Sequence, residues 1–471
     1  AILTPLLRAL ERVEAEPDQA DAWSDLGEAF LADGKPEGAD GAFREALRRD
    51  GHCESAWAGL AGALRSQGRR TQACGVLERG LRVLPDSAGL WGALGRARWT
   101  VAALEGAAEA HRQAIARQPQ ELAHHANLAN TLMSMGDCAG AIAVLDAVLQ
   151  VMPDEPRLRT NRAMALLSSG QFAAGFAEHE ARLRRPGVEV LPGPAWDGST
   201  LHKPLLVIAE QGFGDAIQWA RFLPRLAGRA PEVVLAAHPR LAHLLGQVPG
   251  VDRVVHRKAA LNGELGETFG GVIALMSLPA VLGEDGSTLC EALPLWRPSA
   301  AAVDQWRDRI GLGLRVALAW SGNPAYAMDH IRSAPLHTLA PLGHVEGVRL
   351  FSIQKLHGVD ALMRGEGPRG LLDLGPSLDR GPDAFRDTAA AMVAADIVVT
   401  TDTATAHLAG SLGCEAWLLL SRPADWRWGQ EGTSCPWYPS MTVFRQPQTG
   451  DWSAVSLLVA DALADRIASQ T

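Results

Sequence analysis

The feature that most constrains this chain is a repeat of 34 residues that runs through its first 180 positions. The positions that follow this step are Trp23, Trp57 and Trp91; Ala39, Ala73, Ala107 and Ala141; Leu47, Leu81, Ile115 and Leu149; and Pro85, Pro119 and Pro153. Several unrelated residue types share one period, so the agreement is not a property of one composition. A period of this length is typical of small units that stack on one another.

Each unit has the apolar spacing of two amphipathic helices, with apolar residues three and four positions apart. Small residues such as Gly27, Ala61 and Gly95 allow the two helices of a pair to approach closely. Residues 1–185 resemble the tetratricopeptide repeat, in about five copies. The expected fold is a helical solenoid that captures a protein segment on its concave face. Polar residues that are candidates for this face are Asn127, Asn130, Asn161 and Arg162. A spacer or a dimerisation arm is the alternative.

After this solenoid the pattern changes. Residues 186–204 are rich in proline and glycine and are expected to form a linker. From residue 205 onward, short apolar runs alternate with helical patterns, which indicates a mostly parallel α/β sheet. We expect two Rossmann-like lobes, at 205–300 and 301–471, with a hinge near Trp296–Gly313. The expected strands are Leu205–Ala209, Val233–Ala237, Arg253–Val255, Val272–Met276, Val316–Trp320, Arg349–Ile353, Leu371–Leu374, Ile397–Thr401 and Ala416–Leu420. The expected helices include Ala216–Leu226, Pro239–Val248, Ala384–Ala394, Thr403–Leu412 and Ser453–Ile467.

Charge and composition exclude several classes of function. The net charge is −9 and there is no polybasic run, which argues against a nucleic-acid partner. No apolar run approaches the roughly 20 residues that a membrane helix needs, so no membrane span is expected. The start of the chain has no basic segment of a secretory signal, and no cysteine pair forms a C-x-x-C motif, so we expect a cytoplasmic protein with reduced thiols. No D-x-D triplet or metal-ligand spacing is present, and the expected chemistry is metal-independent, with no cofactor.

Two loops at strand ends carry the strongest functional signals. In the first, Gln211, Gly212, Gly214 and Gln218 surround Asp215, which stands at an expected helix start. The glycines allow close approach to a ligand, and Asp215 is either a helix cap or a general base.

The second loop runs from Thr400 to Gly410 and is rich in hydroxyl groups. Asp402, Thr403, Ala404 and His407 lie where a helix begins, and free backbone N–H groups at such a place favour a phosphate. The alternative is a capped helix, with Asp402 as the cap and a buried histidine.

Three further segments are candidates for the site, and the first two are expected at the same edge. Ser321 and Asn323 follow the strand that ends at Trp320, and Gln354 and Lys355 follow the next strand. Lys355 is either a phosphate ligand or an ordinary surface lysine. Trp426 and Arg427 form an aromatic and basic loop that can stack on a sugar or a base, or pack between the lobes.

These segments also carry a resemblance. The stretches Glu210–Gln218, Trp320–Pro324 and Asp402–Ala409 resemble the heptosyltransferase-like glycosyltransferase superfamily, in the branch that has tetratricopeptide repeats in front. The layout is similar to that of protein O-GlcNAc transferases and, above all, of bacterial flagellin glycosyltransferases. The resemblance implies a GT-B fold, with the acceptor on the lobe at 205–300 and a nucleotide-sugar donor, which is a substrate, on the lobe at 301–471.

The resemblance also implies roles for single residues. Asp215 would be the base of an inverting, metal-free transfer, and Asp402, Thr403, Ala404 and His407 would bind the donor phosphate. The implied acceptor is a protein serine or threonine held by the repeats; flagellin is one candidate, and a CMP-activated nonulosonic acid such as pseudaminic or legionaminic acid is one candidate donor.

The sequence departs from the family pattern in two places, since Ala404 stands where glycine is usual and Ser321 stands near the place of a phosphate-binding lysine. An inactive repeat scaffold and a glycolipid or lipopolysaccharide transferase are the alternatives.

Overall fold

The computed structural model describes residues 4–326 and 328–469 and divides the chain into two compact units, Ala1–Ala165 and Leu166–Thr471. The division falls inside helix α10 (Pro156–Ser168), earlier than the end of the repeats expected at residue 185. Each unit has its own core, and each is described separately below.

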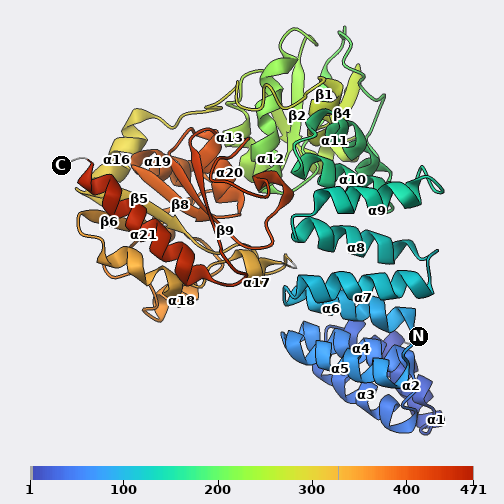
Figure 1. Ribbon diagram of the computed structural model, residues 1–471. Coiled ribbons are helices and arrows are strands. Elements are labelled where there is room, and N and C mark those ends of the chain that lie inside the picture. Colours follow the sequence, from blue (N-terminus) through green and yellow to red (C-terminus); the bar gives the residue numbers. More distant parts are fainter. Residues whose placement is uncertain (1–3, 327, 470–471) are drawn as a thin grey trace. The chain divides into compact units, whose positions relative to one another are not determined.

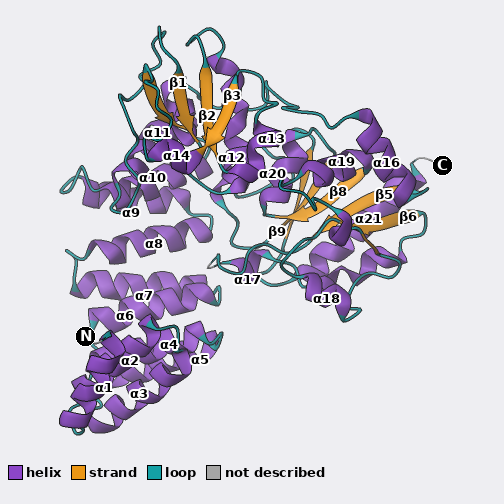
Figure 2. Cartoon of the chain, turned by 180° about the vertical axis from the view of Figure 1, so that it is seen from behind, coloured by secondary structure: helices purple, strands orange, loops and turns teal. Residues whose placement is uncertain are grey.

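The first unit consists of antiparallel helix pairs, as the repeat predicts (Figures 1 and 2). Its helices are α1 (Pro5–Ala15), α2 (Ala20–Ala32), α3 (Pro36–Arg49), α4 (Glu54–Ser66), α5 (Arg70–Val83), α6 (Ala88–Thr100), α7 (Leu104–Arg117), α8 (Leu122–Ser134), α9 (Cys138–Leu149) and most of α10. Within the first pair, α2 and α3 approach so closely that a Cβ built at Gly27 would lie 2.6 Å from the ring of Phe43. The small residue at this position therefore sets the distance between the paired helices.

The tryptophans that recur every 34 residues form hydrogen bonds to the turns between repeats. The indole Nε1 of Trp57 donates to the carbonyl of Gly51 at 2.9 Å, and that of Trp91 donates to Pro85 at the same distance. In the next repeat, His125 occupies the tryptophan position, and its Nε2 lies 2.8 Å from the carbonyl oxygen of Pro119. The contact to the turn is thus kept although the residue type changes.

The turn inside each helix pair has a left-handed residue. Gly34, Gly68, Gly136 and Gly170 have φ values between 70° and 88°. The equivalent residue of the third pair is Ala102, whose φ is 55°. An L-residue with a side chain is strained in this region, so Ala102 is a local departure from the repeat.

The second unit holds two parallel sheets, and the smaller has the strand order β3-β2-β1-β4. Its strands are β1 (Leu205–Ile208), β2 (Val233–Ala237), β3 (Arg253–His256) and β4 (Gly271–Ala274). Here β1 lies between β2 and β4, which pair with it in parallel. The first strand therefore sits where the order of the sheet reverses, and the loop after it opens into the crevice where ligands bind in such sheets.

The helix expected at Ala216–Leu226 differs in the structure. An α-helix, α12, spans Phe213–Trp219, and a 3₁₀-helix, η2, continues over Ala220–Leu226. Pro224 lies inside the 3₁₀ segment and cannot donate a backbone hydrogen bond to Ala220, which explains why the α-helix does not continue. The earlier start makes Gly212 the N-cap, so the interpretation of Asp215 as the cap was wrong.

The larger sheet has the order β10-β9-β8-β5-β6-β7, again fully parallel. Its strands are β5 (Leu314–Ala319), β6 (Val348–Ser352), β7 (Leu372–Asp373), β8 (Ile397–Thr401), β9 (Ala416–Leu420) and β10 (Met441–Arg445). The helices that bear on the site are α19 (Arg386–Ala394), α20 (Ala404–Ser411) and α21 (Trp452–Ala468). Strand β10 was not predicted, and the expected hinge at Trp296–Gly313 contains helix α16 (Ala300–Ile310).

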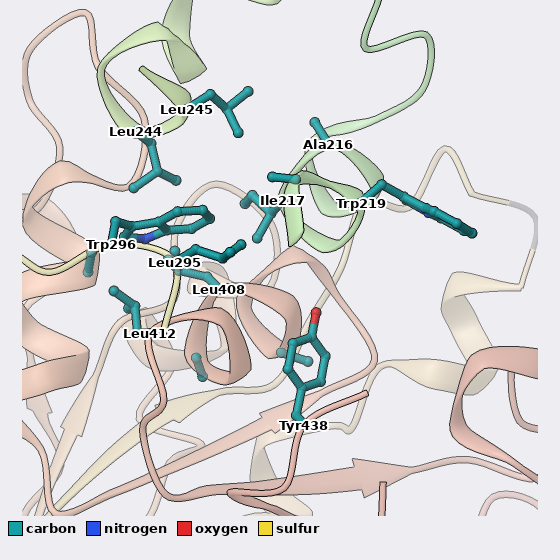
Figure 3. Packing of buried hydrophobic residues seen from close by; sticks show 14 of the residues in the cluster. Ala216, Ile217, Trp219, Leu244, Leu245, Leu295, Trp296, Leu408, Leu412 and Tyr438 are labelled. Atoms are coloured by element: carbon teal, nitrogen blue, oxygen red, sulfur yellow. The ribbon is translucent and has the colours of Figure 1, made fainter. Parts of the chain in front are cut away.

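A shared core joins the two sheets of the second unit. Ile217 and Trp219 of α12 belong to the same buried cluster as Leu408 of α20 and Tyr438 (Figure 3). A Cβ built at Gly214 would lie 3.2 Å from Cδ2 of His407, so α12 and α20 meet closely near their N-termini. Among the described residues, no helix has the length and apolar character required to cross a bilayer.

Candidate functional site

A cavity of about 660 Å³ opens where the two parallel sheets of the second unit present their carboxyl ends. It is lined by the loops that follow β1, β5, β6 and β8, together with a loop after β9. The predicted site residues on its wall are Gly212, Gly214, Asp215, Ser321, Asn323, Gln354, Lys355, Asp402, Thr403, Ala404, His407 and Arg427. The loop around Asp215 and the loop around Asp402, which follow strands of different sheets, therefore line the same cavity.

The wall from the first lobe is the start of α12. Gly212 is the N-cap and has no side chain that could occupy the first backbone N–H groups of the helix. Asp215 lies in the first helical turn, and its carboxylate is 28% exposed. One oxygen, Oδ1, accepts from Nη2 of Arg427 at 2.6 Å. In the part of the chain that the structure describes, no partner contacts the other oxygen, Oδ2, closely enough for a hydrogen bond.

The adjacent wall is the start of α20, whose N-cap is Thr403 and not Asp402 as the capping alternative held. The hydroxyl of Thr403 does not cap the helix but forms a 2.5 Å hydrogen bond with that of Thr405, which in turn lies 2.6 Å from the hydroxyl of Thr400. The backbone N–H groups of Ala404 and Thr405 are therefore left without a side-chain cap, on the wall of the cavity. Such groups favour an anion.

Arg427 is the central charge of the site. Its guanidinium donates to Asp215, to Oδ1 of Asp425 at 3.0 Å and to Oε1 of Gln218 at 2.8 Å. It also lies over the ring of Trp426, 4.6 Å from the ring centroid. The two carboxylates hold the pKa of Arg427 above its usual value despite burial, which lowers it. This one cation connects α12 of the first lobe with the loop that follows β9 of the second lobe.

The loop after β5 is fixed by Gln354. Its side-chain oxygen accepts from the backbone N–H groups of Trp320 and Ser321 at 2.8 and 3.0 Å. Its side-chain nitrogen donates to the carbonyls of Ser321 and His357, both at 2.9 Å. These backbone contacts use the whole amide, so Gln354 positions the ends of β5 and β6.

Lys355 is not free either. Its ammonium group donates to the backbone carbonyls of Leu378 and Asp379. Neither the phosphate-ligand interpretation nor the surface-lysine alternative included this contact.

Arg332 is a cation that the sequence analysis did not select. It lies on the cavity wall, and its Nε donates to Oδ1 of Asp329 at 3.0 Å. A Cβ built at Gly322 would lie 2.7 Å from its Nη2, so the guanidinium stands directly beside the turn after β5. For this turn the sequence resemblance implies a phosphate-binding lysine, and Ser321 stands near that place. Tyr326, whose ring lies under the guanidinium, also lines the cavity.

Two carboxylates in the wall influence each other. Burial and the nearby charge of Asp425 raise the pKa of Asp402 to about 6, while Arg332 and Arg427 act in the opposite direction. Asp402 therefore changes charge within the range of ordinary buffers, on the same wall as the uncapped helix start.

His407 is held as a buried, neutral ring. Its Nδ1 lies 3.0 Å from the hydroxyl oxygen of Tyr438, and its ring stacks on Trp428 with centroids 5.0 Å apart. Burial, with a smaller effect from Arg427, lowers its pKa well below the usual value. His407 thus offers no positive charge to a ligand.

Three predicted residues are not on the cavity wall. Gln211 is exposed, Gln218 is fully buried against Arg427, and the ring of Trp426 packs edge-on against Trp437 with centroids 6.0 Å apart. Within the described ranges, no group of three or more His, Cys, Asp or Glu side chains is arranged to hold a metal ion.

Comparisons with known proteins concern mainly the first unit. Family models described as tetratricopeptide repeat match residues 5–52, 54–97 and 126–187. The N-terminal part of the chain is built of tetratricopeptide repeats. Solved structures similar to these tetratricopeptide repeats include PilF of Pseudomonas aeruginosa, which is 17% identical and covers 45% of this chain and 85% of its own, with a TM-score of 0.35. A tetratricopeptide-repeat protein of Thermus thermophilus is 24% identical and covers 34% and 89%, with a TM-score of 0.31.

One relative extends beyond the tetratricopeptide repeats. Protein FlbA of Caulobacter vibrioides is 28% identical, over 77% of this chain and 70% of its own length. This share is larger than either compact unit, so the similarity includes residues of both.

Proposed function

We propose that the second unit is a GT-B glycosyltransferase that moves a sugar from a nucleotide-sugar to a serine or threonine of a protein bound by the tetratricopeptide repeats. The single observation that supports this proposal most is the shared cavity, whose wall contains both Asp215 and the uncapped start of α20. Its volume, about 660 Å³, is in the usual range for a small-molecule site. The resemblance to flagellin glycosyltransferases makes flagellin our candidate acceptor and a CMP-nonulosonic acid our candidate donor, and the proposed location is the cytoplasm.

The proposed transfer is an inverting displacement. The acceptor hydroxyl forms a bond to the anomeric carbon while the bond from that carbon to the nucleotide phosphate breaks. The hydroxyl proton passes to Oδ2 of Asp215, the oxygen that Arg427 leaves unoccupied. The leaving phosphate takes the electron pair and is stabilised by the N–H groups at the start of α20 and by Arg332.

A second candidate function rests on a different observation. Asp215 is paired with Arg427, Lys355 with two carbonyls, and His407 with Tyr438, so three of the expected groups already have partners inside the protein. This arrangement favours a repeat scaffold whose transferase fold no longer turns over.

Two measurements decide between these functions. Isothermal calorimetry with CMP-, UDP-, GDP- and ADP-sugars should give binding heat to one donor class for a transferase and none for a scaffold. Intact-mass analysis of flagellin co-expressed with the wild-type chain should then show added sugar. The Asp215→Ala variant should add none, with a loss of at least about 100-fold in rate because the general base is removed.

The matched control is Asp304→Asn on the exposed part of α16, which should leave the modification unchanged. Identical masses for flagellin with and without the wild-type chain would count against flagellin as acceptor. Absence of heat with every donor class would refute the transferase.

A further inference from the structure

Three arginines of helices α4, α6 and α10 in the first unit have no counterion, and they occupy related positions of the repeat. Arg65 of α4, Arg96 of α6 and Arg157 of α10 are all exposed. Among the residues that the structure describes, no carboxylate lies within 4.0 Å of their guanidinium groups. Most other arginines of these helices are paired, as Arg98 is with Glu78 at 2.9 Å. These three cations thus lack a local counter-charge although the net charge of the chain is −9.

The repeat register places the three arginines on one face. Arg96 is equivalent to Gly62 of the preceding repeat, which lies three residues before Arg65 in α4. Arg157 is equivalent to Gly89, which lies seven residues before Arg96 in α6. Residues three and seven positions apart lie on the same side of a helix. Because α4, α6, α8 and α10 are the first helices of successive pairs, equivalent positions on them face the same side of the solenoid. We call this side, defined by Arg65, Arg96 and Arg157, the arginine face.

The electrostatics of the arginine face agree with this placement. Although Arg96 is open to solvent, the protein groups around it remove part of its water, and this desolvation lowers its pKa first; the charges of Arg65 and Arg157 lower it further. Arg96 is therefore close enough to both other cations to be repelled by them, without an anion that relieves the repulsion.

The surroundings of Arg96 leave room for a ligand and add no competing charge. Small residues occupy the equivalent positions nearby: Ala58, Gly62, Gly89, Gly92, Ala123 and Ala126. Beneath Arg96, a Cβ built at Gly92 would lie 2.6 Å from the ring of His124, and one built at Gly95 would lie 2.4 Å from that of His111. Both imidazoles are buried, and their unpaired ring nitrogens remain uncharged at neutral pH because burial lowers both pKa values.

We propose that the arginine face binds an acidic segment of a partner protein, with carboxylates of that segment paired to Arg65, Arg96 and Arg157. Guanidinium groups pair with carboxylates through two parallel hydrogen bonds, and an extended chain laid across successive helices can present several carboxylates in turn. Because the partner supplies the missing charge, binding relieves the mutual repulsion of the three arginines. The inference concerns the first unit alone and does not depend on sugar transfer.

The test uses the full chain and a fluorescein-labelled peptide of about 15 residues in which glutamate and serine alternate, long enough to cross several helices. Its neutral counterpart alternates glutamine and serine. Fluorescence anisotropy should show binding of the glutamate peptide that weakens as salt rises from about 0.05 to 0.5 M. The triple variant Arg65→Gln, Arg96→Gln, Arg157→Gln should bind the glutamate peptide at least about tenfold more weakly, since each charged pair contributes a factor of a few.

The matched control replaces three other exposed, unpaired arginines, Arg8 of α1 and Arg79 and Arg82 of α5, by glutamine. It removes the same charge and should change the affinity less than twofold. If circular dichroism shows that the triple variant is unfolded, Arg96→Gln alone should weaken binding severalfold. Equal affinity for the two peptides, or an equal loss in the control variant, would overturn the proposal.

Discussion

His111 is a polar residue in the mainly apolar core of the repeats. It is the buried residue of α7 that corresponds, at the 34-residue step, to Phe43, Leu77 and Leu145, which are also buried. Only 1% of His111 is exposed, and its Nδ1 has no hydrogen-bond partner. We therefore expect His111→Leu to stabilise the first unit, because it restores the apolar residue of the other repeats and removes an unpaired polar atom.

Two effects determine how much His111→Leu should raise the unfolding free energy of the first unit. A buried polar atom without a partner costs roughly 1–3 kcal/mol, so the gain at pH 7.5 should be about 2 kcal/mol. Burial and the charge of Arg96 lower the pKa of His111 from 6.5 to about 4. Between these values the unfolded chain binds a proton here and the folded chain does not, so the folded state loses stability as pH falls. At pH 5 this proton uptake lowers the unfolding free energy of the wild type by roughly 2 kcal/mol. The leucine variant has no imidazole and does not suffer this loss.

The assay is native-state hydrogen exchange with mass spectrometry on the full chain, because it reports the opening free energy of α6 and α7 separately from that of the second unit. His111→Leu should raise this free energy by about 2 kcal/mol at pH 7.5 and by roughly 4 kcal/mol at pH 5. The control, His52→Leu on an exposed turn, should show no pH-dependent gain. A difference between variant and wild type that stays constant from pH 7.5 to 5 would refute the account of a buried, neutral imidazole.

Two further predictions address other parts of the chain. Ala102→Gly should stabilise the first unit by about 1 kcal/mol in urea unfolding, because φ at this position is 55° and glycine adopts it without strain; a loss of stability would contradict this. Sulfate, whose charge is constant across the range, should bind the cavity severalfold more weakly at pH 7.5 than at pH 5.5, because Asp402 acquires its negative charge near pH 6. In Asp402→Asn this difference should disappear, and calorimetry that finds it unchanged would show that another group is responsible.

Much of the architecture could be predicted because its signals are local. The 34-residue repeat specifies the helix pairs of the first unit, and buried parallel strands such as β2 and β9 are continuous apolar runs in the sequence. Strand β10 was missed because Thr442 and Arg445 interrupt Met441–Arg445, which leaves only Val443 and Phe444 as adjacent apolar residues. The start of α12 was misplaced because Gly212 caps through its backbone, whereas a side-chain cap was expected.

The site could be predicted only where it lies at strand ends. Asp215 and Asp402 were found because parallel strands bring their carboxyl ends to one edge. The ion pair of Asp215 with Arg427 joins residues 212 positions apart, and no periodic pattern specifies such a contact. Arg332 reaches the cavity from the short helix α17 (Asp329–Arg332), which has too few residues to show a helical period, so its place at the cavity depends on the path of the chain. The bonds that occupy Gln354 and Lys355 are to backbone carbonyls and N–H groups, which the residue letters do not reveal.

The hydrogen bonds that Arg221 and Arg427 form with distant segments affect the order in which the protein folds during its synthesis. Arg221, near the beginning of the second unit, donates to the carbonyl of Trp437, and Arg427 holds Asp215 and Gln218. A ribosome that has translated the first lobe has not yet delivered these late residues, whereas each helix pair of the repeats finds its neighbours within the most recently synthesised stretch. The repeats can thus fold during translation, while the α/β portion cannot complete its core until the segment with Arg427 and Trp437 has been synthesised.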